Sequence, residues 1–193
     1  MPDSTTPDST TPDTTTPDTT EPVPTGEVAV LVGVQSALAT PAAVTVARAM
    51  SHFGEHAAGW VALSGVGALL APRRRRDWLL VGVGAVAAHA AAIAIKLVVR
   101  RRRPHHPDIA VNVGTPSSLS FPSAHATSST AAAMLLCRAT RSPLPLLVVP
   151  LMALSRLVLG VHYPTDVLAG IAVGATVARV TTRMGAEKEK GRL

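Results

Sequence analysis

Cysteine and aromatic residues are scarce in this 193-residue chain: it has one cysteine, Cys137, and aromatic side chains make up 3% of it. A single cysteine excludes an intramolecular disulfide and leaves a cysteine-based metal site without a second ligand. Residues 1–26 have neither the basic start nor the apolar core of a cleavable signal peptide. We therefore expect Cys137 to be a small apolar core residue, and we expect targeting to depend on the first hydrophobic helix.

Hydrophobic residues are abundant, at 47% of the chain, and the mean hydropathy is +0.31. These values fit either a soluble domain or a small membrane protein. The distribution favours the membrane protein, because apolar residues form blocks of about 17 to 24, the length that a helix needs to cross a ~30 Å hydrocarbon core. The sequence therefore predicts an all-α membrane bundle of about six transmembrane helices, at residues 27–50, 55–71, 78–99, 121–139, 143–161 and 163–180. Gln35, Thr40 and Pro41 interrupt the first block, so an interfacial or kinked helix is the alternative there.

The two ends of the chain differ from this apolar region. The first 26 residues contain the repeats PDSTT, PDSTT, PDTTT and PDTTE, with no large apolar side chain. Such a segment cannot bury enough surface to offset the entropy of ordering, so a disordered, weakly acidic tail is predicted rather than a solenoid. The predicted organisation is a disordered tail at 1–26, a membrane domain at 27–182 and a basic cytoplasmic tail at 183–193.

Basic residues are concentrated in connections that indicate the orientation. If the 72–77 connection, with Arg73 to Arg76, is cytoplasmic, six spans also place the 138–141 turn and both tails inside, as the positive-inside rule prefers. The loop at 100–121 begins with four arginines and then lies on the other side, which is the main observation against this orientation. That objection weakens if some of those arginines bind an anionic substrate. The prediction is a site that opens away from the cytoplasm.

Three short polar clusters interrupt the apolar sequence between residues 96 and 166. They lie at or near the ends of the last four apolar blocks, and in an up-and-down bundle those ends face the same side of the membrane. The clusters are therefore expected to converge. Together they supply cations, histidines, a serine and a carboxylate, the groups that phosphoryl transfer requires: Lys96, Arg103 and Pro104; then Pro122, Ser123, Ala124 and His125; then Ser155, Arg156, His162 and Asp166.

The first cluster lies where a helix is predicted to end. Lys96 and Arg103 are seven residues apart, so both are expected on one side of a helix that stops at Pro104. A basic flank that anchors a helix among lipid headgroups is the alternative. Lys96 argues against it, because an ionisable group inside an apolar stretch is costly and by default functional.

The second cluster is predicted to begin a helix. Pro122 suits the first turn, and the amides of Ser123 and Ala124 would be unpaired donors at its positive end, where phosphate oxygens bind readily. The Ser123 hydroxyl can add a contact, and His125 can give or take a proton. Simple capping of the helix by serine and histidine is the alternative.

The third cluster pairs a histidine with a carboxylate. His162 and Asp166 are four residues apart, on one helix face if Pro164 lies in the first turn, so the carboxylate can hold the imidazole in one tautomer while the other nitrogen attacks phosphorus. Arg156 offers a planar fork for two phosphate oxygens. Such a pair is often structural, but an arginine nearby in lipid-spanning sequence favours catalysis.

In order and spacing, the motifs Lys96-x6-Arg103-Pro104, Pro122-Ser123-Ala124-His125 and Ser155-Arg156-x5-His162-x3-Asp166 resemble the three-part signature of the phosphatidic acid phosphatase type 2 superfamily. The resemblance covers about residues 78–180 and departs from the family at Ala124, where glycine is more usual. It implies a metal-independent phosphatase without a cofactor. His162 would form a phosphohistidine, Asp166 would orient it, and His125 would protonate the leaving oxygen and then activate water. The implied phosphate-binding groups are Lys96, Arg103, Ser123, the Ala124 amide and Arg156.

Within that superfamily the chain looks most like the actinobacterial decaprenylphosphoryl-5-phosphoribose phosphatases, through the stretches at 51–56, 111–129 and 153–170. The resemblance implies a multi-pass cell-membrane hydrolase that acts on a polyprenyl-linked phosphate in cell-wall synthesis. Its partners would be a membrane lipid phosphate and the bilayer, with no nucleic acid. Phosphatases of undecaprenyl pyrophosphate, phosphatidylglycerophosphate and phosphatidic acid share the signature and stay open.

Two alternatives lie outside this class of enzyme. A vanadium haloperoxidase uses the same pocket, but six lipid-length blocks without a large soluble domain oppose it. A membrane scaffold or transporter would not need the complete set of competent residues found here.

The remaining histidines are given lesser roles. His52 and His56 lie around the Gly54-Glu55 turn, where a polar interhelix turn is favoured over a metal site. His89 is seven residues before Lys96 and is expected to make a buried hydrogen bond. Three residues of the loop over the site are candidates for headgroup contact but not for catalysis: His105, His106 and Asp108.

Overall fold

The computed structural model describes residues 24–190, with side chains described as far as residue 187, and this range folds as helices without a strand. Its only β pairing within that range is an isolated bridge between Arg102 and Leu119. The predicted all-α fold is confirmed. The predicted tail at 1–26 lies outside the described residues except for its last three. The α-helices are α1 (Gly26–Leu38), α2 (Pro41–Gly54), α3 (Ala58–Leu70), α4 (Arg75–Val99), α5 (Ala124–Thr140), α6 (Val148–Val158) and α7 (Pro164–Lys190).

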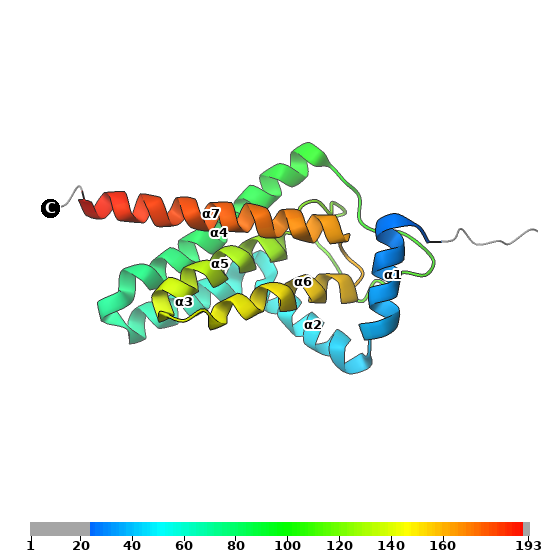
Figure 1. The fold of residues 1–193 in the computed structure, drawn as a ribbon, viewed down its shortest axis with the longest axis horizontal. Helices are drawn as coiled ribbons and strands as arrows, with labels where there is room; N and C mark the ends of the chain where they lie inside the picture. The colour runs from blue at the N-terminus through cyan, green and yellow to red at the C-terminus, as the bar shows by residue number, and fades with distance from the viewer. Residues whose placement is uncertain (1–23, 191–193) are drawn as a thin grey trace, which may run out of the picture.

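The helices form a bundle around α5, with α1 lying across one end of it (Figure 1). α5 packs against α4, α6 and α7, and α3 packs on the outer side of α4. The end that α1 crosses holds the start of α7, so it is the end where the three polar clusters meet. α7 continues to Lys190, past the boundary predicted at residue 182.

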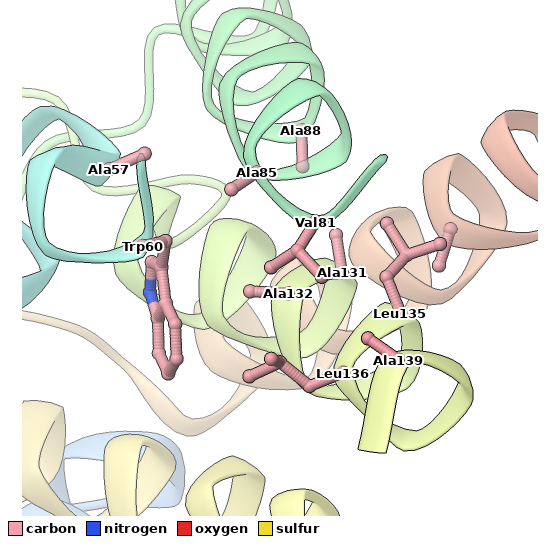
Figure 2. Close-up of a cluster of buried hydrophobic side chains, with 11 residues drawn as sticks. Ala57, Trp60, Val81, Ala85, Ala88, Ala131, Ala132, Leu135, Leu136 and Ala139 are labelled. Atoms are coloured by element: carbon pink, nitrogen blue, oxygen red, sulfur yellow. The ribbon is translucent and has the colours of Figure 1, made fainter. Parts of the chain in front are cut away.

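Small side chains let these helices approach closely. The core between α3, α4 and α5 is built from Val81, Ala85 and Ala88 on α4, and Ala131 and Ala132 on α5 (Figure 2). Trp60 of α3 supplies the bulk that the alanines lack, and its indole Nε1 donates to Ser129 Oγ at 3.2 Å. Close packing of small residues is the means by which membrane helices associate without a hydrophobic driving force.

The first predicted block, 27–50, is two helices rather than one straight helix. α1 ends at Leu38 and α2 begins at Pro41, whose ring has no N–H and fits a first turn. Thr40 caps α2 by accepting a hydrogen bond from the Ala43 amide at 3.2 Å. The two helix axes meet at 115°, so the interrupting residues mark a sharp bend, as the kinked alternative anticipated.

Two described helices are long and apolar enough to cross a membrane by themselves, Pro72–Val99 and Pro164–Glu187. α1 with the continuous run Pro41–Leu70 makes a third if the bent pair counts as one span, and Leu144–Val158 is a shorter apolar helix. The prediction of six transmembrane helices therefore stays a prediction. α1 begins at the polar end of the bundle and α7 ends at the opposite one (Figure 1). The sequence prediction that both tails share one side does not fit this arrangement.

Candidate active site

A cavity of about 470 Å³ opens where α4 ends, α5 begins and α6 gives way to the turn before α7. The structure brings six of the predicted site residues to its wall: Lys96, Arg103, Ala124, His125, Arg156 and His162. Ser123 and Asp166 are fully buried and do not line it. The predicted convergence of the three clusters is therefore present, with two of the eight predicted site residues behind the cavity wall.

Lys96 reaches the cavity from the last turn of α4. Its Nζ donates to the carbonyls of Leu119 at 2.9 Å and Ser120 at 3.0 Å, rather than to the anion expected for a buried ammonium. Since an ammonium carries three N–H donors, one remains for a ligand. Lys96 thus ties the loop before α5 to the end of α4.

Arg103 is not on the same helix as Lys96, in contrast to the prediction. α4 ends at Val99 because Arg100 takes a left-handed conformation, with φ at 53°, and returns its amide to the Lys96 carbonyl. Arg103 lies in the loop that follows, where its guanidinium donates to the carbonyls of Ser117 at 2.8 Å and Val161 at 2.6 Å. Burial lowers the pKa of Arg103 to about 10, which leaves it charged at neutral pH.

α5 begins at Ala124, two residues after Pro122, where the sequence predicted the first turn of this helix. Ser123 is the N-cap, and its side chain accepts from the Ala126 amide at 3.5 Å. Its own amide, predicted to be an unpaired donor, donates to the Asp166 carbonyl at 2.9 Å. Ser123 therefore joins α5 to α7 in this structure, whereas Ala124 and His125 reach the cavity.

α2 contributes to the site through Ser51, a residue outside the predicted set. The Ser51 carbonyl lies 2.9 Å from His125 Nε2, and its hydroxyl accepts from Arg156 at 3.0 Å. The same guanidinium donates to the Ala47 carbonyl at 3.3 Å and to Ser155 Oγ at 3.1 Å. Arg156 is 1% exposed, so these contacts fix its orientation at the cavity wall.

His162 lies in the turn before α7, and not on the helix itself, yet it still meets Asp166 four residues later. Its Nδ1 is 3.6 Å from Asp166 Oδ2, and its Nε2 is 3.3 Å from an Arg103 nitrogen. Burial, together with the nearby charges of Arg103 and Lys96, lowers the pKa of His162 to about 4, although Asp166 opposes the shift. The imidazole is therefore neutral at pH 7, with Nε2 on the side of the cations.

Asp166 is oriented by more partners than the sequence indicated. Its Oδ2 accepts from the Tyr163 amide at 2.8 Å, and its Oδ1 accepts from Arg101 at 3.0 Å. Arg101 also donates to Glu27 of α1 at 2.6 Å and stacks over the Tyr163 ring at 4.1 Å. Nothing in a run of four arginines distinguishes Arg101, so only the fold assigns it this position.

The lesser histidines follow their predictions in part. His52 Nδ1 lies 3.8 Å from Glu55, which fits a polar turn, and no group of three metal-ligating side chains occurs within the described range. The buried hydrogen bond expected of His89 is absent among residues 24–190, where its Nδ1 is buried without a partner. His106 lies 3.7 Å from Asp108 in the loop. Cys137 is half-buried and free.

Comparison with known proteins assigns the chain to a family. The family model described as the PAP2 superfamily matches residues 77–190, more than half of the chain. The chain belongs to the PAP2 superfamily. It is a phosphatase of this family, a phosphoric ester hydrolase associated with the membrane.

The curated PAP2 relatives share one name. A decaprenylphosphoryl-5-phosphoribose phosphatase of Mycobacterium tuberculosis is 59% identical over 170 residues, which cover 88% of this chain and 96% of that protein. The protein of the same name from Mycolicibacterium smegmatis is 71% identical over 148 residues, covering 76% and 82%.

Two solved PAP2-type structures show the same fold. A transmembrane PAP2 type phosphatidylglycerolphosphate phosphatase from Bacillus subtilis has a TM-score of 0.65 at 21% identity, covering 82% of this chain and 86% of that one. LpxE of Aquifex aeolicus has a TM-score of 0.60 at 19% identity, covering 80% and 93%. At these identities the likeness concerns the fold alone.

Proposed function

We propose that this chain hydrolyses the terminal phosphomonoester of a polyprenyl-linked phosphosugar, the chemistry named for decaprenylphosphoryl-5-phosphoribose. The observation that carries the proposal is the 59% identity to a phosphatase of that name over 96% of its length. The cavity supports it, because its lining includes the imidazoles of the two predicted catalytic histidines and three cationic side chains. Phosphatases of undecaprenyl pyrophosphate, phosphatidylglycerophosphate and phosphatidic acid are the alternative substrate assignments.

In the first step, His162 Nε2 attacks phosphorus as the bond from phosphorus to the leaving oxygen breaks. Asp166 accepts from Nδ1–H and stabilises the charge that develops on the ring. His125 donates its proton to the leaving oxygen, which departs as the sugar hydroxyl. Arg103, now 3.3 Å from Nε2, turns to the incoming phosphate, and that movement frees the nitrogen for attack.

In the second step, water attacks the phosphohistidine on the side that the sugar has left. His125 takes the proton from this water, the bond between phosphorus and Nε2 breaks, and inorganic phosphate leaves. Both enzyme groups return to their starting states. Throughout, the oxygens of the phosphoryl group are held by Lys96, Arg103, Arg156 and the Ala124 amide. Lys96, Arg156 and the amide are in position before the substrate arrives, and Arg103 joins them when it turns to the phosphate, so that together they stabilise the charge of the transition state. Ser123 acts by capping the helix that presents that amide.

The enzyme is proposed to lie in the cell membrane with its active site on the extracytoplasmic face. The end of the bundle away from the cavity carries Arg73 to Arg76 in the α3–α4 connection and Arg138 and Arg141 at the α5–α6 turn, and such basic connections prefer the cytoplasm. At the cavity end, Arg101 and Arg103 are bonded to protein groups. Two of the four arginines that opposed this orientation are therefore engaged with protein groups rather than free in the loop.

Phosphate release by purified protein in detergent tests the proposal. The substrates are polyprenyl phosphosugars, polyprenyl mono- and diphosphates and glycerolipid phosphates, each with and without vanadate, which mimics the transition state. We expect the phosphosugar to be preferred and His162→Ala to abolish turnover while the protein stays folded. More than trace activity in that variant would refute the assigned nucleophile, and preference for a glycerolipid would refute the substrate.

A further inference from the structure

The cavity is larger than the phosphate chemistry requires. Beyond the groups that hold phosphate, its wall includes polar side chains from two other places, the turn between α2 and α3 and the middle of α4: His52, Glu55, His56 and His89. The rings of His56 and His89 lie 5.8 Å apart, centroid to centroid. These polar side chains therefore line the same cavity as the residues proposed to bind phosphate.

His89 lacks the partner that its position demands. It lies ten residues before the end of α4, about 15 Å along the axis, within a helix apolar enough to cross a membrane. Its Nδ1 is buried and makes no hydrogen bond within the described part of the chain. A buried polar atom without a partner is costly, and ionisable groups at membrane depth usually mark a ligand path.

The turn that carries Glu55 and His56 is held in an unfavourable backbone conformation. His56 and Ala57 have φ of 50° and 60°, in the left-handed region that residues with a side chain seldom adopt. The break interrupts a run from Pro41 to Leu70 that otherwise continues as helix. Backbone strain of this kind is retained where it positions functional groups, and irregular backbone at membrane depth is tolerated where it lines a cavity.

This turn lies against the general acid. A side chain added at Gly54 would place its Cβ 2.7 Å from the ring of His125, so Glu55 and His56 directly follow the residue that touches that ring. His125 is proposed to protonate the leaving oxygen, and the leaving group must therefore lie on this side of the phosphate. The chemistry of two imidazoles and a carboxylate suits hydroxyl groups, because together they donate and accept, whereas a carboxylate repels a second phosphate.

We propose that Glu55, His56 and His89 form a subsite for the hydroxyl groups of the leaving group, which selects phosphate esters of a sugar over those of a simple alcohol. The inference rests on the proposed function and adds to it the residues that recognise the alcohol. His89 donates or accepts through its unpaired Nδ1, and the strained turn presents Glu55 and His56 to the same ring.

Two synthetic lipids that differ only in hydroxyl groups test this subsite. One is a farnesyl phosphodiester of ribose 5-phosphate, and the other has 2,3-dideoxyribose in place of the ribose. The unchanged protein should have a kcat/KM at least tenfold higher for the ribose lipid. His89→Leu, and separately His56→Gly, which suits the left-handed backbone, should each reduce that ratio about tenfold while leaving inhibition by vanadate unchanged. His105→Leu is the matched control. The sequence made His105 a candidate for headgroup contact, but the structure places it outside the lining of this cavity, so this change should keep the ratio.

The outcomes separate the two proposals. Equal kcat/KM for the two lipids in the unchanged protein, or an unchanged ratio in both variants, overturns the subsite and leaves the phosphatase intact. Release of phosphate from neither lipid removes the proposed function and the subsite together. A variant that vanadate no longer inhibits has a damaged phosphate-binding site. The ratio of kcat/KM for the two lipids in the other variant then supports or overturns the subsite.

Discussion

At the residue scale, the carboxylate of Asp166 contacts several groups at once. One oxygen faces His162 and accepts from the Tyr163 amide, and the other accepts from Arg101. Arg101 does not line the cavity, so its effect on the reaction must pass through Asp166. It is a positioning residue rather than a catalytic one.

Replacing Arg101 should therefore slow the chemical step without weakening binding. We expect Arg101→Gln to lower kcat about tenfold with KM nearly unchanged, since the carboxylate loses the charge that orients it. Arg101→Lys should recover part of the loss. Steady-state kinetics on the preferred lipid measure this, with Arg100→Gln as the control, because Arg100 bonds only to its own helix at the Leu97 carbonyl among the contacts described for its side chain. A rise in KM alone would place Arg101 in substrate binding instead.

Lys96 combines two tasks that its variants can separate. Lys96→Met should cost on the order of 3–4 kcal/mol of transition-state stabilisation, a few hundredfold in rate, and should weaken vanadate in parallel. Lys96→Arg should not restore activity, because the planar guanidinium cannot reproduce the contacts to the Leu119 and Ser120 carbonyls and also reach the phosphate. Near-normal activity in both variants would remove Lys96 from the site.

The lowered pKa of His162 predicts an unusual acid limb. An ordinary histidine nucleophile would lose activity as pH falls through about 6.5, but His162 should stay neutral until the pH approaches about 4. The same difference in pKa affects stability. Between about pH 6.5 and about pH 4 His162 is protonated in the unfolded chain but not in the folded one, so the free energy of unfolding decreases as the pH falls through this range. The pH dependence of kcat/KM in detergent measures the first effect. An acid limb of the unchanged protein centred near 6.5 would contradict the burial of this ring.

The three polar clusters could be predicted because catalytic residue types at fixed spacings can be recognised in a sequence. The contacts that support them could not be predicted, because they join residues far apart in the chain. The predicted lining positions meet at one cavity, but Ser51, Arg101 and the turn at Gly54 join them through tertiary contacts between residues 65 to 105 positions apart in the sequence. The sequence made Lys96 a candidate for binding phosphate but could not show that a loop folds over it and that its ammonium also bonds two carbonyls. Periodicity located the helices but could not show that Arg100 would end α4.

At the scale of elements, the packing of α5 on α7 depends on glycines. A Cβ at Gly174 of α7 would lie 2.3 Å from the Thr127 carbonyl of α5, and one at Gly170 would lie 2.8 Å from the Ser123 carbonyl. Backbone atoms cannot move aside as a flexible side chain can. The close approach of these helices also sets the distance between the second and third clusters.

Gly174→Ala should therefore separate the two helices at some cost in stability. We expect a loss of roughly 1–3 kcal/mol, as for other overpacked cores, measured by thermal unfolding in detergent. Gly65→Ala in α3 is the control: no atom lies within 4 Å of its added Cβ, so this change should be neutral or stabilise by up to about 1 kcal/mol. Equal stability of the two variants would show that α5 and α7 pack more loosely than described.

At the scale of the whole molecule, the position of α1 decides where the chain begins relative to the membrane. Its first residues lie at the cavity end, where Glu27 bonds Thr165 and Arg101, while α7 ends at the other (Figure 1). The sequence alone suggested an even number of crossings because the first block has the length of a span. The bend at Pro41 divides that block into two helices, so the number of crossings stays a prediction.

Single cysteines test this topology in a Cys137→Ser background. A membrane-impermeant reagent on intact cells should label positions 25 and 107 and should not label position 75, since the first two lie at the cavity end and the third at the opposite, basic end. Labelling of 75 alone would invert the orientation and place the active site in the cytoplasm. Opposite results for 25 and 107 would contradict the placement of α1.

The contacts that Ser51 makes limit how far the protein can be truncated from its N-terminal side. The match to the family begins at residue 77, and a fragment that starts there would retain each residue of the predicted catalytic set. It would nevertheless leave the Arg156 guanidinium without the two acceptors that α2 supplies and His125 without the carbonyl beside its ring. The segment that the family model matches is therefore shorter than the set of helices that builds the site, and a minimal enzyme engineered from this chain must keep the helices before residue 77.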